Sequence, residues 1–212
     1  MQFSIKLLES NSQISNSILQ ALIPEVDNYL KKALIIIRKD LPSLIKNIIY
    51  NTPEYNSLMG GQLQYEFGIP DPSSQLSNII TIWSNNIKIE YNGPTVSNNK
   101  IKASFSVSLI RSDFSDVLSS DSGFVIDALR GYQLPWLEWL LLEVNKAIIS
   151  KQEVIIGPNK FSRTGLAIMR PSNKSWRVPS EFAGTIKDNW ITRAIDNSES
   201  QINERLDKAF SL

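Results

Sequence analysis

Two four-residue stretches have the spacing of a serine activated by a lysine. Ser43–Lys46 and Ser97–Lys100 both fit the pattern S-x-x-K, in which the lysine can help to deprotonate the serine hydroxyl. The S-D-N and K-T-G elements that accompany this pattern in serine acyltransferases are absent. A pattern with two fixed positions arises often by chance, so neither stretch predicts a catalytic serine.

A loose series of aspartates could serve a different chemistry. Asp113, Asp116, Asp121 and Asp127 lie within fifteen residues, and carboxylates are the ligands that Mg²⁺ prefers. The surrounding sequence R-S-D-F-S-D-V-L-S-S-D-S-G is also typical of a loop in which Asp and Ser cap a short helical turn. We favour the capping interpretation, and a metal-dependent hydrolase is the weakest of our three functional hypotheses.

The residue types that most often carry catalysis are missing. The chain of 212 residues has no histidine and no cysteine, which excludes imidazole and thiolate metal ligands, cysteine nucleophiles and a Ser-His-Asp triad. It also lacks the glycine-rich patterns of nucleotide-binding loops. We therefore predict a protein that is not an enzyme, with no catalytic, cofactor-binding or metal-binding residues.

Charge and hydropathy limit the surroundings and partners that the sequence allows. The formal net charge is +1, so binding to nucleic acid or anionic lipid would need a local basic patch. The sequence contains neither an apolar run near the roughly 20 residues that span a bilayer nor a secretory signal pattern. We expect no membrane contact and folding in a cytoplasm.

A long helix is predicted at the N-terminal end. Between Gln13 and Tyr50, apolar residues recur every three or four positions, as on one face of an amphipathic helix. Pro24 is expected to kink this helix, and Asp40-Leu41-Pro42 has the cap and first-turn proline of a helix restart, so a break is expected there. The apolar face either packs on its own domain or also lines up against a neighbouring subunit.

The rest of the pattern predicts an α+β fold in one domain, 1–212. Cap-plus-proline starts predict helices from Pro53, Pro72 and Pro135, and alternation predicts antiparallel strands around 87–109 and 154–169. Helical spacing returns from about Asp188. The parts are a helical region at 1–50, helix and antiparallel sheet with an inserted short helix at 51–175, and a docking strip with a C-terminal helix at 176–212.

Basic and aromatic residues alternate between Lys160 and Arg193. This composition occurs in grooves that bind single-stranded nucleic acid and also in protein interfaces, where Trp and Arg supply most of the binding energy. Because the net charge is near zero, we favour an interface, and a nucleic-acid-binding module in this basic C-terminal third is the alternative. The candidate interface residues are Trp136, Trp139, Arg163, Arg170, Trp176, Arg177, Trp190 and Arg193.

Several strings resemble structural proteins of tailed-bacteriophage virions. They are L-P-W-L-E-W-L-L at 134–141, S-R-T-G-L-A-I-M at 162–169 and W-R-V-P-S-E-F-A-G-T-I-K-D-N-W-I-T-R-A-I at 176–195. The long helix followed by P-E-Y-N-S-L-M-G-G-Q-L at 53–63 is similar to neck and tail-completion proteins of these phages. In that family a helix precedes a small antiparallel sheet, and the subunits form a ring at the head–tail junction.

The resemblance implies a function without catalysis. It predicts a homo-oligomeric ring in the virion, assembled in the host cytoplasm, that joins the portal or capsid to the tail. The partners would be copies of this chain and portal, adaptor, terminator or tail-tube proteins, with viral DNA passing through without sequence-specific binding. Head-to-tail contact between identical subunits is what closes such a ring.

Overall fold

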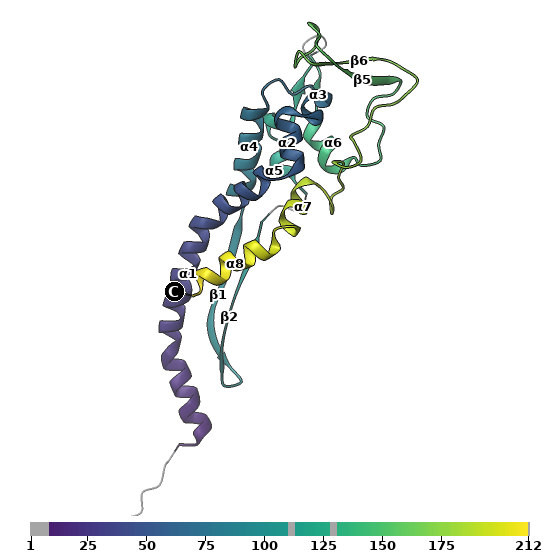
Figure 1. Cartoon of the computed structure of the whole chain (residues 1–212). Helices are drawn as coiled ribbons and strands as arrows, with labels where there is room; N and C mark the ends of the chain where they lie inside the picture. Colours follow the sequence, from purple (N-terminus) through teal and green to yellow (C-terminus); the bar gives the residue numbers. More distant parts are fainter. Residues whose placement is uncertain (1–8, 110–112, 128–130, 212) are drawn as a thin grey trace, which may run out of the picture.

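The protein is an elongated α+β molecule built on one long helix (Figure 1). The computed structural model describes residues 9–109, 113–127 and 131–211. Helix α1 (Asn11–Tyr50) begins at a capping box, in which the Ser10 hydroxyl accepts from the backbone N–H of Gln13 and the Gln13 side chain accepts from the backbone N–H of Ser10. These bonds satisfy donors that a helix start leaves unpaired.

The predicted break at Asp40–Pro42 is wrong, because α1 is one continuous helix that contains both Pro24 and Pro42. A proline inside a helix costs about 3 kcal/mol. Residues on both sides of Pro42 are buried, including Leu41, and burying one leucine or isoleucine side chain contributes about 1.5–3 kcal/mol. The packing of this half of the helix therefore outweighs the local cost of the proline.

Three shorter helices follow α1, of which α2 and α4 pack on it and α3 packs on α2. Helix α2 (Pro53–Gly60) begins at a Thr52 cap and α4 (Pro72–Asn85) at an Asp71 cap, each with a proline in the first turn, as the sequence predicts. Helix α3 (Gln62–Phe67) follows α2 directly. It ends at Gly68, whose φ of +67° is a left-handed conformation that favours glycine.

In the part of the chain that the structure describes, the strands form three separate two-stranded antiparallel sheets. Strands β1 (Lys88–Ser97) and β2 (Lys100–Ser108) are the longest pair and run along α1 (Figure 1). The other pairs are β3 (Val125–Ile126) with β4 (Gln133–Leu134), and β5 (Gln152–Ile156) with β6 (Ala167–Pro171). Antiparallel pairing was predicted for the first and third pairs, whereas β3 and β4 are too short for alternation to reveal them.

The remaining helices complete one hydrophobic core. They are α5 (Ser115–Leu118), the 3₁₀ turn η1 (Asp121–Gly123), α6 (Trp136–Leu142), α7 (Trp190–Asp196) and α8 (Glu199–Ala209). The predicted C-terminal helix is thus two helices, and α8 packs back along α1. Among the described residues, no helix combines the length and apolarity needed to cross a membrane.

Candidate interaction surfaces

Two of the predicted interface tryptophans belong to the interior of the single chain. Trp136 and Trp190 have no exposed surface. The Trp136 indole donates a 3.1 Å hydrogen bond to the Ser122 carbonyl, and the Trp190 indole donates a 2.8 Å hydrogen bond to the Thr52 hydroxyl. Because each ring is enclosed and each N–H is paired, the prediction that they anchor an interface is wrong.

Trp176 is also a core residue, with 7% of its surface exposed. Its indole N–H donates a 3.0 Å hydrogen bond to the Glu66 carboxylate. Its ring lies edge-on to Phe67 and to Trp139, with ring centres 5.8 Å and 6.0 Å apart, respectively. The interface prediction is therefore wrong for Trp176. Trp139 is half-buried and keeps some surface that a partner can reach.

Arg193 is an internal link between α7, α2 and the strip before α7. Its guanidinium lies 2.9 Å from Glu54, donates a 2.9 Å hydrogen bond to the Phe182 carbonyl and lies 3.1 Å from Asp188. Glu54 is only 5% exposed, so Arg193 compensates a charge that would otherwise be buried alone. The predicted inter-subunit pair is an intramolecular one.

The other three candidate arginines differ in their surroundings. Arg163 donates a 3.2 Å hydrogen bond from Nε to the carbonyl of Gly68 at the end of α3, where a cation interacts favourably with the helix dipole. Arg170 and Arg177 are exposed and remain interface candidates. The strip Ser175–Ile195 thus closes the core and ties helices together, and the surface that it leaves to a partner includes Arg177 and the 55%-exposed Ile186.

Asp113 caps a local turn, as the sequence interpretation predicts, whereas Asp116 makes a contact across the fold. The Asp113 carboxylate accepts the backbone N–H of Ser115 at the start of α5, and Asp116 accepts the side-chain amide of Asn86. Among the described residues, no three acidic side chains are grouped so that they could hold a metal ion. The serine–lysine pattern at 97–100 flanks the turn of an exposed hairpin.

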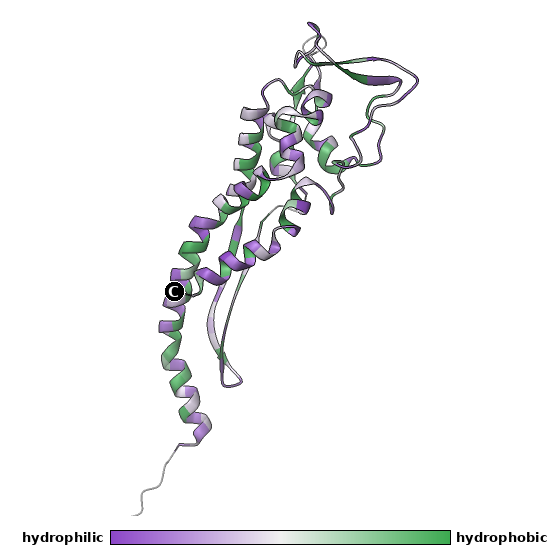
Figure 2. Cartoon of the chain, in the orientation of Figure 1, coloured by the Kyte–Doolittle hydropathy of each residue, from purple (hydrophilic) through white to green (hydrophobic). Residues whose placement is uncertain are grey.

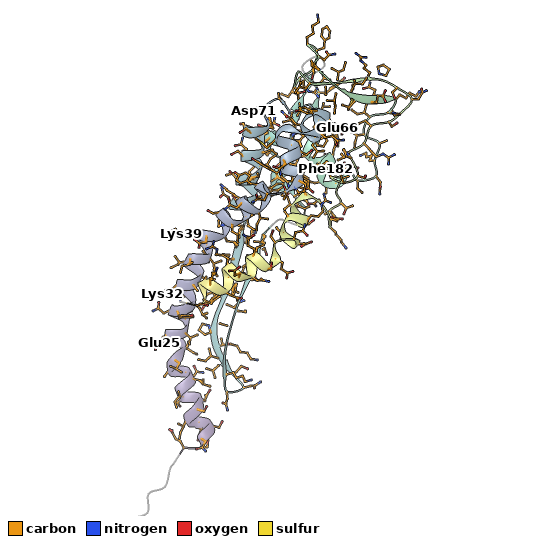
Figure 3. All side chains as sticks on the ribbon, viewed as in Figure 1. Glu25, Lys32, Lys39, Glu66, Asp71 and Phe182 are labelled. Carbon is orange, nitrogen blue, oxygen red and sulfur yellow. The ribbon has the colours of Figure 1, made fainter. Side chains whose placement is uncertain are left out.

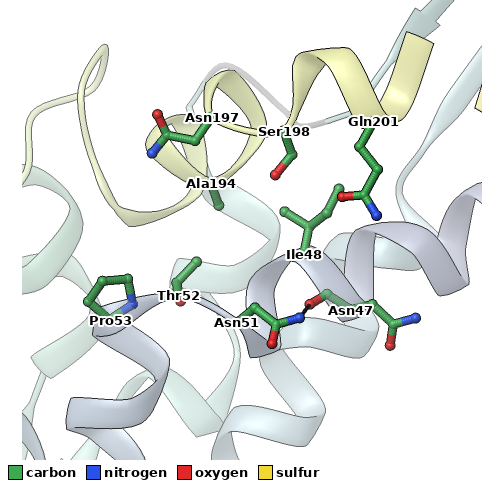
Figure 4. A pocket seen from close by; sticks show the side chains of 9 residues that line it. All are labelled: Asn47, Ile48, Asn51, Thr52, Pro53, Ala194, Asn197, Ser198 and Gln201. Atoms are coloured by element: carbon green, nitrogen blue, oxygen red, sulfur yellow. Dashed lines mark hydrogen bonds between the residues drawn. The ribbon is translucent and has the colours of Figure 1, made fainter. Parts of the chain in front are cut away.

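Two cavities of about 200 Å³ each lie beside α1. The first lies between the end of α1 and the α7–α8 turn, and Figure 4 shows it lined by amide and hydroxyl side chains with Ile48, Pro53 and Ala194. The second is apolar and is lined by Leu30, Leu34, Ala103, Phe105 and Phe210 with Tyr91 and Ser104. Neither cavity is lined by a carboxylate or a cationic side chain.

The N-terminal half of α1, which we call the helix extension (Asn11–Lys32), exposes an apolar flank. None of its residues, all of which the structure describes, is buried. Ile18 is 56% exposed and Leu22 is 42% exposed, and Tyr29 lies on the same side two turns further on. Hydrophobic residues continue along α1 toward its N-terminal end (Figure 2). Glu25, two turns after Ile18, adds a charge at the edge of this flank, and Lys32 and Lys39 project from α1 further along (Figure 3).

Tyr91 fastens the hairpin β1–β2 to the helix extension. Its hydroxyl donates a 2.7 Å hydrogen bond to Asp27, which also pairs with Lys31 at 2.6 Å. Burial and this hydrogen bond raise the pKa of Tyr91 to about 12. The hydrogen bonds from Lys31 and Tyr91 lower the pKa of Asp27, so the carboxylate form holds the two elements together.

Cations gather on a second surface at the other end of the molecule (Figure 1). Residues 151–177 contain six Lys and Arg against the single acid Glu153, a net charge of +5, so the rest of a chain of net charge +1 carries −4. We call the exposed part of this segment, on the β5–β6 hairpin and the residues beside it, the hairpin surface. It consists of Lys151, Lys160, Phe161, Arg170, Lys174 and Arg177.

Comparison with protein-family models, with curated proteins and with solved structures found no match to this chain. Two exposed surfaces, the helix extension and the hairpin surface, are the candidates for contact with a partner. The sequence indicated both through the α1 periodicity and the Lys160–Arg193 composition. It gave no signal for the roles of Glu54, Thr52 and Glu66 as internal partners, because each is an isolated polar residue that tertiary packing brings to an arginine or an indole.

Proposed function

We propose that this chain is a non-enzymatic structural subunit that assembles with copies of itself, as the neck and tail-completion ring subunits of tailed bacteriophages do. The observation that carries the proposal is the uncovered apolar flank of the helix extension. The extension has 22 residues and is about 33 Å long at 1.5 Å per residue. An amphipathic helix of this length is stabilised by packing of its apolar face rather than by helix propensity.

The flank continues a contact already made inside the chain. Tyr29 donates a hydrogen bond to the carbonyl of Phe210 where α8 ends, and Arg205 of α8 pairs with Asp40 further along α1. Beyond the point where α8 ends, Leu22 and Ile18 lie on the same side of α1 and are exposed. A second copy of the chain would cover these residues, which are on the part of the helix that projects furthest from the core.

The ring geometry and the place in the virion rest on the resemblance of the long helix and the 53–63 string to neck proteins. A contact between the helix extension of one copy and a different face of the next is head-to-tail, and repeated contacts of that type close into a ring. Portal, adaptor or tail proteins would then bind the two faces of the ring. The absence of histidine and cysteine from the sequence costs such a subunit nothing.

The test is the mass of the protein in solution, by light scattering after size exclusion, together with negative-stain microscopy. We expect an oligomer with ring-shaped particles. Ile18→Ser with Leu22→Ser should give monomers that keep the circular dichroism spectrum of the folded chain, because both side chains are exposed in the single subunit. Ile35→Ser is the matched control, since Ile35 is exposed on another side of α1, and it should stay oligomeric.

Two results would count against the proposal. A wild-type chain that remains monomeric at about 100 µM, well above the micromolar dissociation constants of ordinary transient contacts, would contradict self-assembly. Oligomers that survive the double change would show that the helix extension is not the contact.

A further inference from the structure

We infer that the hairpin surface binds the phosphate backbone of nucleic acid. This inference does not depend on self-assembly through the helix extension, which lies at the opposite end of the molecule (Figure 1). The proposed binding surface is the part of the basic segment formed by β5, β6 and the residues that flank them. Arg193 and Arg163 are excluded, because their guanidinium groups are used inside the chain.

The cations outnumber the acid that faces them. Glu153 lies directly opposite Arg170 in the β5–β6 register. Its carboxylate pairs with Lys174 at 3.2 Å, and the Lys174 side chain is 79% exposed. One carboxylate therefore pairs with Lys174 and has Arg170 as its neighbour across the strand pair. Lys151, Lys160 and Arg177 add three exposed positive charges, so the hairpin surface keeps a net charge of about +4 for a partner.

The loop between the strands is held in place. The backbone N–H of Gly157 donates to the Leu166 carbonyl at 2.7 Å, the N–H of Asn159 donates to the Gly165 carbonyl at 2.9 Å, and Arg163 ties the loop to the end of α3. Ordering of these residues therefore costs less on binding than it would in an unpaired loop. The cations are presented on a preformed support.

Phe161 is the most exposed large apolar side chain of the described residues, at 82%. Lys160 Nζ lies 5.1 Å from the centre of its ring. An exposed ring beside a cation matches the stacking and phosphate contacts that single strands use. The five-residue strands span about 17 Å, which corresponds to about five phosphates at 3.4 Å per strand of duplex. The length and the charge both fit a nucleic-acid backbone.

The experiment is fluorescence anisotropy of the full chain with labelled single-stranded and duplex DNA at low and moderate salt. We expect micromolar affinity in 50 mM salt. About four phosphate contacts give a log–log salt slope near −3.5 on duplex, so the affinity should fall roughly a hundredfold between 50 and 200 mM.

Matched variants distinguish binding through the hairpin surface from binding that depends only on the overall charge. Lys160→Gln, Arg170→Gln and Lys174→Gln together should weaken binding at least tenfold and reduce the salt slope by about 2.5. Lys32→Gln, Lys39→Gln and Lys102→Gln change the net charge equally at exposed positions elsewhere, and should change affinity less than about threefold. Phe161→Ala should weaken single-strand binding about fivefold or more and leave duplex binding unchanged. Circular dichroism checks that each variant is folded.

Three outcomes would overturn the inference. They are no binding at 50 mM salt, equal losses in the two triple variants, and competition by a poly-glutamate peptide as effective as that by DNA, which would assign the hairpin surface to an acidic protein partner.

Discussion

The two halves of α1 have the same apolar pattern and opposite surroundings. From Ala33 onward, eight α1 residues are buried in the hydrophobic core, where α1 contacts α2, α4, α7, α8 and the β1–β2 pair, a region we call the body. In the helix extension no residue is buried, although Ile18 and Leu22 continue the pattern. Apolar spacing therefore identifies the contact side of a helix, but it does not say whether the contact lies in the same chain.

The largest expected effect is in the body. Trp190→Ala removes a fully buried indole whose ring centre lies 5.2 Å from that of Trp83, and it removes one of the two donors to the Thr52 hydroxyl, the other being the backbone N–H of Tyr55. We expect a loss of about 3–5 kcal/mol in the free energy of unfolding, measured by urea denaturation with an unchanged slope. Phe161→Ala is the exposed control and should change stability by less than about 0.5 kcal/mol. A loss below about 1 kcal/mol for Trp190→Ala would contradict the difference in packing between the body and the helix extension.

A smaller effect is expected where the body holds a buried charge. Arg193→Met keeps most of the side-chain volume but leaves Glu54 without its cation. Breaking a buried pair costs about 3–5 kcal/mol, and because Arg193 is 29% exposed we expect about 2–3 kcal/mol here. Arg177→Met, at an exposed arginine of the same segment, should cost less than about 0.5 kcal/mol. The double variant with Glu54→Gln should recover part of the loss, and no recovery would argue against the pair.

The smallest effects depend on pH and have opposite signs in the two regions. Burial raises the pKa of Glu66 above its ordinary value of 4.5, chiefly by desolvation. The native state then holds this proton more tightly than the unfolded state, so wild-type stability falls as pH rises from 4.5 through the raised pKa. Glu66→Gln should remove this penalty while still accepting the Trp176 hydrogen bond, and so should gain stability relative to wild type toward neutral pH.

Asp27 in the helix extension should behave in the opposite way. Its pKa is lowered, so its contribution is present above the ordinary value of 3.8 and is lost as pH falls through the lowered pKa. Asp27→Asn should therefore be less stable than wild type at neutral pH and approach it in acid. Urea denaturation of both variants between about pH 3 and 8 measures the two trends. Parallel trends would contradict the desolvation of Glu66 or the hydrogen bonds that Lys31 and Tyr91 donate to Asp27.

Local signals in the sequence predicted most of the elements. Proline with Thr52 or Asp71 indicated the starts of α2 and α4, and alternation indicated the antiparallel strands β1 and β2 within 87–109. These signals work because capping and period-2 burial depend on residues close in the chain. They failed at Pro42, where distant packing outweighed a local preference, and at β3 and β4, where each strand is two residues long.

The sequence by itself determined the α+β class, the amphipathic side of α1, the lack of imidazole and thiol chemistry, and the concentration of positive charge between 151 and 177. Only the tertiary structure decided which aromatic rings and arginines are available to a partner. Trp136, Trp190 and Arg193 have the composition of an interface but are enclosed by residues more than ten positions away along the chain. Burial is a property of packing between distant segments, so composition can name candidates and cannot rank them.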